Sequence, residues 1–569
     1  MPAPQFVAAL SGIFEKSPWV AARVTQRRPF DSCLQLHEAM CEAVRQAAPA
    51  ERLALIRAHP ELAGRAAIRG ELTTESAREQ QGAGLTQCTP EEFARLQELN
   101  GEYLQRFGFP FVIAVKGHTR HSILAALAAR VSHSPEEEQR VALEQIGRIA
   151  GFRLAAIVEE PLATRILSMA DYLARFSEDL SGLTCSYLTP THRATAALIR
   201  DWMLAAGLEV QIDAVGNVIG RWQVAESAPT LLTGSHYDTV VNAGRYDGRL
   251  GILLPIAVVA ELRRNGVTPH CSVAVIAFAE EEGVRFRSTF LGSSAIAGRF
   301  DTSVLEATDA AGTTLRQAMI DAGLDPGSIP SAALERSNLC GYVEVHIEQG
   351  PVLLTEGQPL GVVTSIAGST RSRVIVTGVA GHSGTVPMGL RHDAAAAAAQ
   401  LVIFIERRCS GIEGLVGTVG QLHVPGGAMN VIPGRCELSV DIRAADDAIR
   451  HAAQSDVLAE SAAIAGRRGV HIEWQEVLNI SASKCADGLQ QAIAASICRV
   501  TGARAARFLP SGAGHDAMVM AQLTDTGMLF VRCGNGGVSH HPAESVTAAD
   551  VDVAARVFAD LLQSFRGNA

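Results

Sequence analysis

The chain has 569 residues, of which 47% are hydrophobic and 19% are charged, and its formal net charge is −10. This length is too great for one ordinary hydrophobic core, so roughly two to four domains are expected. The negative charge, with no stripe of Lys or Arg, argues against a nucleic-acid partner. We also expect no membrane partner and a cytoplasmic protein, because the start does not resemble a signal peptide and the apolar stretches are too short to cross a bilayer.

The chain up to about residue 160 is predicted to be helical throughout. Asp31, Thr89 and Ser134 are the predicted N-caps in this part. A proline at position 161 marks the join to the next part, where a helix could end. Apolar residues recur at helical spacing over 6–14, 34–47, 90–107, 121–131 and 135–157.

The rest of the chain is predicted to be an α/β domain with an insertion. β-rich runs at 230–233, 272–279 and 528–532 alternate with helical patterns at 193–206, 250–264 and 547–562, which is typical of a layered sheet covered by helices. Strand patterns at 373–378, 417–423 and 436–443, with helices at 393–406 and 448–465, indicate an inserted α+β domain. The predicted division is therefore an all-α domain at 1–160, an α/β domain at 165–372 and 481–569, and the inserted domain at 373–480.

Residues that bind metal ions recur along the α/β part. Some of them directly follow apolar strands, so nitrogen and carboxylate ligands can converge at one edge of the sheet and suit zinc or manganese. Singly, a histidine in a strand or the acidic run 280–282 would be unremarkable, but jointly they favour a dinuclear metal site. The candidates are His236, Asp238, Asp247, Glu281, Glu282, His346 and His540.

A two-ion site needs one carboxylate that bridges the ions and further ligands for each ion. Asp247 is the natural bridge. His236 and His346 could complete the site of one ion. Glu282 and His540 could complete the other, although the spacing alone does not separate His540 from its neighbour His541.

The remaining acidic residues are predicted to act beside the ions. Asp238 could orient His236, since an imidazole ligand needs its other nitrogen held. Glu281 is then left as the general base, which would deprotonate the attacking water and later protonate the leaving nitrogen. Eleven scattered cysteines are expected to be free thiols, and only Cys533 lies near this chemistry in the sequence.

Five motifs in this part resemble the family of allantoate amidohydrolases and N-carbamoyl-L-amino-acid hydrolases, over about residues 165–569. The resemblance implies a dinuclear metallohydrolase with a catalytic domain interrupted by a dimerisation domain, and hence a homodimer. The motifs are Gly-Ser-His-Tyr-Asp-Thr at 234–239, Gly-Arg-Tyr-Asp-Gly at 244–248, Glu-Glu-Gly-Val-Arg-Phe at 281–286, His-Ile-Glu-Gln-Gly-Pro at 346–351 and Ser-His-His-Pro-Ala-Glu at 539–544.

The resemblance also implies residues that bind substrate. His382, in Gly-His-Ser-Gly-Thr-Val-Pro-Met, matches an imidazole that reaches into the partner subunit's site and stabilises the oxyanion. Asn430 and Arg443 match residues that bind the substrate carboxylate, and His515 matches a site loop. Ser369 departs from the family pattern, since a glutamine that contacts substrate is usual there, so the substrate is less secure than the reaction type.

The helical part carries a separate set of motifs. Ser76, Glu79 and Gln80 fall at positions i, i+3 and i+4, so they could line one wall of a pocket. By themselves they could equally form a solvated face, and His59-Pro60 could simply end a helix. The set is His59-Pro60-Glu-Leu-Ala, Ser76-Ala-Arg-Glu79-Gln80, Phe-Gly-Phe-Pro-Phe at 107–111 and Arg153 in Gly-Phe-Arg-Leu.

These motifs resemble 2-oxo-4-hydroxy-4-carboxy-5-ureidoimidazoline (OHCU) decarboxylase over roughly residues 1–160. The resemblance implies decarboxylation without a cofactor. His59 would be the acid/base group, with Pro60 beside it, and Arg153 would bind an oxygen or carboxylate. Glu79 and Gln80 would hold the ureido and ring groups, and Ser76 would form a hydrogen bond. A helical module with no catalytic role, used for docking, is the alternative.

The two halves together predict a bifunctional enzyme of urate and ureide breakdown. The decarboxylase product is (S)-allantoin, and allantoate lies one hydrolysis further on, so the fusion favours allantoate as the second substrate. The expected products are ureidoglycine or ureidoglycolate, ammonia and carbon dioxide. An N-carbamoyl-L-amino acid or ureidoglycine stays open as an alternative substrate of the second half.

Overall fold

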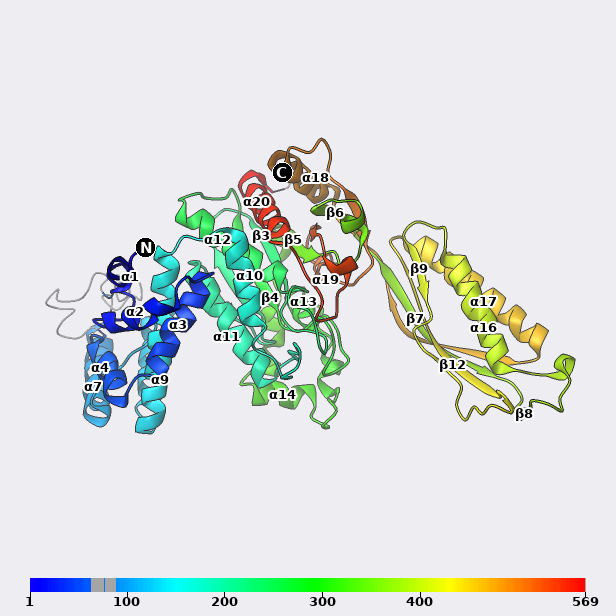
Figure 1. The fold of residues 1–569 in the computed structure, drawn as a ribbon, viewed down its shortest axis with the longest axis horizontal. Coiled ribbons are helices and arrows are strands. Elements are labelled where there is room, and N and C mark those ends of the chain that lie inside the picture. Colours follow the sequence, from blue (N-terminus) through cyan, green and yellow to red (C-terminus); the bar gives the residue numbers. More distant parts are fainter. Residues whose placement is uncertain (63–75, 77–87, 568–569) are drawn as a thin grey trace.

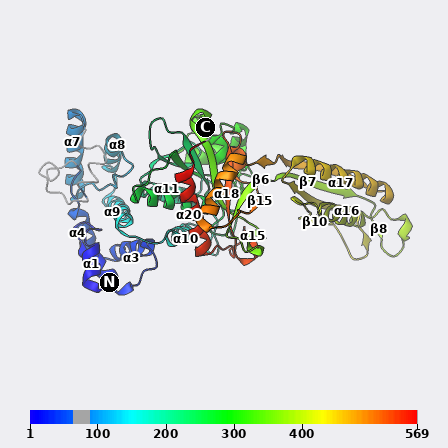
Figure 2. The ribbon, with the colours of Figure 1, turned by 90° about the horizontal axis from the view of Figure 1, so that it is seen from above.

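The computed structural model describes residues 1–62, 76 and 88–567. A bundle of helices is followed by a central α/β domain and then by an elongated lobe that extends from it (Figure 1). The same three parts are seen in sequence from above (Figure 2). This multidomain arrangement confirms the predicted fold class.

The helices of the first part surround one apolar core. Leu36, Met40, Leu99, Tyr103 and Ile146 lie in it, each on the buried side of an amphipathic helix. The helices are α1 (Ala3–Leu10), α2 (Pro18–Val24), α3 (Cys33–Arg45), α4 (Pro49–Ala58), α7 (Pro90–Phe107), α8 (Arg120–Arg130) and α9 (Pro135–Ile157).

Side-chain caps fix where several of these helices begin. Thr89 and Ser134 accept hydrogen bonds from the backbone N–H groups of Glu92 and Glu137, as predicted for N-caps. The prediction for Asp31 was wrong by one residue, because Ser32 caps α3 and Asp31 bonds to Gln35 instead.

A nine-stranded sheet forms the centre of the second part. The path β1-β2-β4-β3-β5-β16-β6-β14 is joined by β15, which pairs with β6. The adjacent strands β4, β3, β5 and β16 run parallel to one another, so their carboxyl ends meet at one edge of the sheet. The strands are β1 (Glu209–Ile212), β2 (Val218–Trp222), β3 (Thr230–His236), β4 (Ser272–Phe278), β5 (Leu339–Ile347), β6 (Leu360–Ile366), β14 (Ser483–Lys484), β15 (Phe508–Ser511) and β16 (Thr526–Val531).

Helices cover both faces of this sheet. Leu231 and Val273 belong to the apolar cluster on one face, whereas their neighbours Leu232 and Ala274 belong to the cluster on the other. The central strands, such as β3, β4 and β16, are thus buried on both sides, which explains their continuous apolar sequences. The α-helices of this part are α10 (Leu162–Leu173), α11 (Pro190–Ala205), α12 (Leu250–Arg264), α13 (Leu291–Ile296), α14 (Leu315–Asp321), α15 (Val352–Thr355), α18 (Asp487–Thr501), α19 (Asp516–Met520) and α20 (Ala548–Ser564).

The elongated lobe is an antiparallel sheet with two helices packed on it. Its strand order is β10-β12-β7-β13, with β9 beside β12 and a separate β8-β11 pair at the tip. Its sheet begins at Gly368, five residues before the predicted boundary. The elements are β7 (Gly368–Thr377), β8 (Gly381–His382), α16 (Ala394–Cys409), β9 (Leu415–Thr418), β10 (Leu422–His423), β11 (Val431–Ile432), β12 (Arg435–Ala444), α17 (Asp447–Arg468) and β13 (His471–Ile480).

Specific contacts join the helical bundle to the α/β domain. Arg148 on α9 forms a two-pronged ion pair with Asp201 on α11, at 2.6 and 2.8 Å. The Tyr172 hydroxyl on α10 donates to Glu38 on α3 at 2.9 Å. In the part of the chain that the structure describes, every helix is too short or too polar to cross a bilayer.

Candidate active sites

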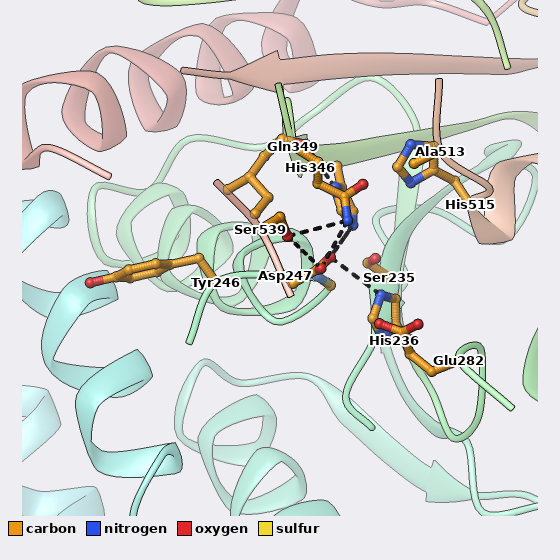
Figure 3. A network of polar contacts seen from close by, with 12 residues as sticks. Ser235, His236, Tyr246, Asp247, Glu282, His346, Gln349, Ala513, His515 and Ser539 are labelled. Carbon is orange, nitrogen blue, oxygen red and sulfur yellow. Dashed lines mark hydrogen bonds and ion pairs between the residues drawn. The ribbon is translucent and has the colours of Figure 1, made fainter. Parts of the chain in front are cut away.

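The predicted metal ligands lie at the carboxyl edge of the parallel strands. His236 is the last residue of β3, and His346 is the last but one of β5. Glu282 follows the end of β4, and His540 lies in the loop after β16. Asp247, just before α12, lies among them, as Figure 3 shows.

Asp247 is in contact with both predicted groups of ligands. Its Oδ1 lies 3.2 Å from Nε2 of His346 and 3.9 Å from Nε2 of His236. Its Oδ2 lies 3.1 Å from Nε2 of His540, and this imidazole nitrogen is 3.4 Å from Oε1 of Glu282. The Asp247 carboxylate thus faces His236 and His346 with Oδ1, and it faces the Glu282–His540 pair with Oδ2.

A glycine permits the close approach of two of these ligands. Gly248 has a φ of +65°, and a Cβ at this position would lie 2.4 Å from Nε2 of His236. Any larger residue would be strained by its backbone and would collide with the ligand. The Tyr-Asp-Gly motif therefore places Asp247 and His236 side by side.

Asp238 holds the acidic segment as well as His236. Its oxygens accept hydrogen bonds from the backbone N–H groups of Glu281 and Glu282, both at 3.1 Å. Nδ1 of His236 lies 3.2 Å from the Asp238 carbonyl and 3.4 Å from its carboxylate. One buried residue therefore holds both the imidazole of His236, a candidate metal ligand, and the main chain of the two glutamates.

The cluster concentrates negative charge in a buried place. Burial opposes the ionised form of Asp247, but hydrogen bonds from His346 and His540 hold its pKa well below its usual value. Burial raises the pKa of Glu281 well above its usual value, and burial raises the pKa of Glu282 to about 7.

The donor set fits divalent metal ions. Imidazoles form the ion-pair contacts of Asp247 and Glu282, and within each group of candidate ligands the donor atoms lie within 4.8 Å of one another. Imidazole and carboxylate ligands suit zinc and manganese. Glu281 lies beside Glu282 in a third group of donors with His236.

Three residues around Asp247 were missed by the sequence analysis. Gln349 Nε2 and the Ser539 hydroxyl each donate to Oδ2 of Asp247 at 2.8 Å. Glu544 accepts from the backbone N–H of Asp247 at 3.2 Å. Gln349 lies in the motif at 346–351, and Ser539 and Glu544 lie in the motif at 539–544, so membership of these motifs was the sequence feature that could have identified them. Cys533 lies behind Gln349, whose N–H donates to its sulfur at 3.3 Å.

The loop after β15 lies next to the candidate metal ligands. It carries His515, and Arg443 contacts it from the lobe. His515 is buried, and its ring packs edge-on against His346 with centroids 4.4 Å apart. Its Nε2 is 2.7 Å from the Ser511 hydroxyl. Arg443, on β12 of the lobe, donates to the Gly512 carbonyl at 2.8 Å and to Asp441.

Ser369 also lies at this junction rather than at the metal ligands. Its hydroxyl donates to Asp441 at 2.9 Å, and Asp441 in turn accepts from Arg443. The two strands that carry them are paired at Ser369 and Arg443. Ser369 is therefore placed to influence the same guanidinium that the sequence assigns to the substrate carboxylate.

His382 and Asn430 are not brought to the metal ligands of their own chain. Both are exposed at the tip of the lobe, where β8 pairs with β11 and Ser383 N–H donates to the Asn430 carbonyl at 3.0 Å. Figure 1 places β8 at the far end of the lobe from β3 and β5.

The helical bundle holds a second cluster of predicted site residues. Arg153, Ser76 and His59 are buried, and Pro60 is half-buried at the end of α4. Arg153 donates to the Ser76 hydroxyl at 3.3 Å. Glu79 and Gln80 lie outside the described residues.

Glu15 is the residue that the sequence analysis missed in this cluster. Its carboxylate is buried and accepts from Arg153 at 3.0 Å and from the Ser76 hydroxyl at 3.2 Å. His59 lies near this pair, and its Nδ1 is 3.1 Å from the Leu55 carbonyl. Burial lowers the pKa of His59 to about 4, so its imidazole is neutral at physiological pH.

Two family models match the chain. Residues 1–155 match the OHCU decarboxylase family, and residues 232–564 match peptidase family M20/M25/M40. The first match covers the bundle with His59 and Arg153. The second covers every predicted metal ligand.

Individual proteins are similar to the second part of the chain. An allantoate deiminase of Arabidopsis thaliana is 40% identical over 69% of this chain and 80% of its own length. An N-carbamoyl-L-amino acid amidohydrolase of Geobacillus stearothermophilus is 41% identical over 66% of this chain and 91% of its own. The crystal structure of an amidase of the hydantoinase/carbamoylase family from Burkholderia multivorans has a TM-score of 0.65 and 30% identity, covering 71% of this chain and 97% of that one.

Proposed function

Because the chain belongs to peptidase family M20/M25/M40 and begins with an OHCU decarboxylase segment, we propose that it is a bifunctional enzyme of ureide breakdown. The first part converts OHCU to (S)-allantoin with loss of carbon dioxide. The second part hydrolyses allantoate to ureidoglycine or ureidoglycolate with release of ammonia and carbon dioxide. The observation that supports the second activity is that Asp247 is shared by two groups of potential metal ligands. One group includes His236 and His346, and the other includes Glu282 and His540.

We propose that this cluster holds two divalent ions, zinc or manganese, on His236, His346, Asp247, Glu282 and His540. The ions would supply Lewis-acid activation of the substrate and of the attacking water. Glu281 takes the proton from that water and returns it to the leaving nitrogen, a role supported by its buried place beside Glu282 and His236.

The substrate carboxylate is bound at the junction of lobe and sheet. Arg443 reaches the loop of Gly512 from the lobe, and Gly514 of that loop lies beside Glu281. A forked guanidinium is suited to a carboxylate. Asn430 and His382 come from a second copy of the chain, because β8, which carries His382, and β11, which follows Asn430, pair at the far end of the lobe from β3 and β5.

A homodimer through the lobe is supported by its exposed apolar side chains. Such side chains gather around the β8-β11 tip and are typical of a surface that another protein covers. They are Val379, Met388, Leu390, Met429 and Val431.

Decarboxylation needs only groups that the bundle supplies. When the carboxylate leaves, an electron pair remains on carbon and requires hydrogen-bond donors and then a proton. Arg153 is a donor held in place by Glu15 and by the Ser76 hydroxyl, and His59 is the acid/base group. We propose that this reaction uses no cofactor.

An N-carbamoyl-L-amino acid is the rival substrate of the second half. The relatives do not separate the two, since the allantoate deiminase and the carbamoyl amidohydrolase are 40% and 41% identical. Ser369, beside Arg443, differs from the residue usual in the family. The decarboxylase segment favours allantoate, because its product is one hydrolysis away from it.

The test is mass spectrometry of the products. The full chain with manganese is given allantoate, ureidoglycine or an N-carbamoyl-L-amino acid, and separately freshly generated OHCU. We expect ammonia from allantoate at a kcat/KM above that for the other two, and allantoin from OHCU. A higher kcat/KM for the N-carbamoyl-L-amino acid would contradict the proposal.

A further inference from the structure

Glu544 joins two loops that carry candidate metal ligands and lie far apart in the sequence. It is 5% exposed, and its Oε1 accepts from the backbone N–H groups of Tyr246 and Asp247 at 2.8 and 3.2 Å. Its Oε2 lies 2.9 Å from the Ser539 hydroxyl, whose single hydrogen is shared between Glu544 and Asp247. The same hydroxyl lies 2.8 Å from Oδ2 of Asp247. The loop of Asp247 and the loop of His540 are thus tied by one side chain.

The loop that contains Gly244 packs tightly against the Glu544 carboxylate. A Cβ at Gly244 would lie 2.2 Å from Oε1 of Glu544, so the Gly-Arg-Tyr-Asp-Gly loop lies directly on the carboxylate. This close approach explains the glycine at position 244, where φ itself is unremarkable.

The His540 loop needs such a tie. The His540 side chain is 49% exposed, and its φ is +55°, which is a strained backbone conformation for a residue with a Cβ. By contrast His236 and His346 are buried at the ends of strands. Of the two ligand groups, the one with His540 therefore depends more on contacts from its own loop.

We propose that Glu544 is a positioning residue that sets the affinity of the ion held by Asp247, Glu282 and His540. It holds the main chain of Asp247 and the Ser539 end of the His540 loop in one register. The inference rests on the proposed two-ion site and assigns to Glu544 no contact with metal or substrate.

The number of hydrogen bonds predicts how variants should rank. Glu544→Ala removes all three acceptor contacts and frees the loop. Glu544→Gln keeps one oxygen for the two backbone N–H groups, while its amide N–H can donate to Ser539, which still donates to Asp247. The amide variant should therefore hold the loop nearly as well as the carboxylate.

Glu348 provides a matched control. It is also buried, and it accepts two backbone N–H groups, those of Val352 and Leu353, at 2.7 and 3.1 Å. These contacts stabilise α15 and do not involve Asp247. Glu348→Ala should lower the melting temperature without changing metal affinity.

The test is calorimetric titration of manganese into the full-length protein. The protein is first stripped of metal with a chelator, and the chelator is then removed. The number of ions bound per chain is measured by metal analysis after dialysis. We expect two ions in the wild type and in Glu544→Gln. Glu544→Ala should keep one ion and bind the other about 10- to 100-fold more weakly, the usual effect of losing a partner of a ligand. Should Glu544→Ala fail to fold, Glu544→Asp, one methylene shorter, should show the same selective weakening.

The outcomes separate this inference from the proposed function. If the wild type binds fewer than two ions, the two-ion site itself is wrong, and the role of Glu544 falls with it. If the wild type binds two ions and Glu544→Ala binds both with unchanged affinity, or Glu348→Ala loses the same ion, only the role of Glu544 is overturned.

Discussion

The position of His382 leads to a quantitative prediction about mixed dimers. His382 is exposed at the tip of the lobe, whereas Asp247 is buried at the end of the parallel strands. If His382 completes the site of the partner subunit, a chain with His382→Ala and a chain with Asp247→Asn are each inactive for ammonia release as pure dimers. Losing an oxyanion donor alone costs about 100- to 1,000-fold in rate.

The expected recovery follows from counting sites. Random pairing of equal amounts makes about half of the dimers mixed, because a twofold dimer has two equivalent positions. In each mixed dimer the metal ligands of the His382→Ala chain meet an intact His382 of the partner, and the other site has lost both groups. The mixture should therefore show about one quarter of wild-type activity.

The assay is ammonia release from allantoate after the two purified chains, with different tags, are unfolded, mixed and refolded. As a control, wild type is mixed with a chain that carries both substitutions. Action across the dimer predicts about one quarter of wild-type activity for this control too, whereas action within one chain predicts about one half. No recovery in the first mixture, with mixed dimers verified by double-tag purification, would refute the reasoning.

Further predictions concern the separate roles of the residues. Glu281→Gln should retain both ions, measured by metal analysis, while kcat for allantoate falls by about 100- to 10,000-fold, and near-normal turnover would exclude Glu281 as the base. Chelation should abolish ammonia release but leave allantoin formation from OHCU unchanged, and loss of both would mean that the bundle also needs metal. Since the pKa of His59 is lowered to about 4, the imidazole stays neutral as the pH falls through 6.5, so the decarboxylation rate should decline only as the pH nears 4; a midpoint near 6.5 would contradict this environment. A protein of residues 1–160 should decarboxylate alone, and His59→Ala in the full chain should leave allantoate turnover intact; a substantial loss with the fold preserved would show that the sites are coupled.

The convergence of the candidate metal ligands was predictable because strands and their ends are encoded locally. The apolar run 272–279 fixes where β4 ends, and Glu281 and Glu282 follow it at once. The helices with clear caps, such as those at Thr89 and Ser134, were predicted for the same reason. The error at Asp31 shows the limit, since Ser32 is an equally good cap by residue type.

Contacts between distant segments were not predictable in this way. Glu544 and Tyr246 are 298 residues apart, and Arg153 and Glu15 are 138 residues apart. Each pair forms only when separate elements pack together, so one sequence shows the residues but not their partners. The separation of His382 from its own metal ligands likewise follows from the length of β7 and β12, which carry the tip outward.

The join between the two halves argues against direct transfer of intermediates. A cavity of about 870 Å³ lies between the bundle and the α/β domain, next to the Arg148–Asp201 ion pair. Its walls combine apolar side chains such as Phe152 and Trp202 with charged ones such as Arg45 and Glu144, and among the described residues no predicted site residue lines it. Allantoin must also be opened to allantoate between the two proposed reactions, and neither site supplies that step. We therefore expect the fusion to keep the two proposed activities in equal amounts, with each site exchanging its substrate with solvent.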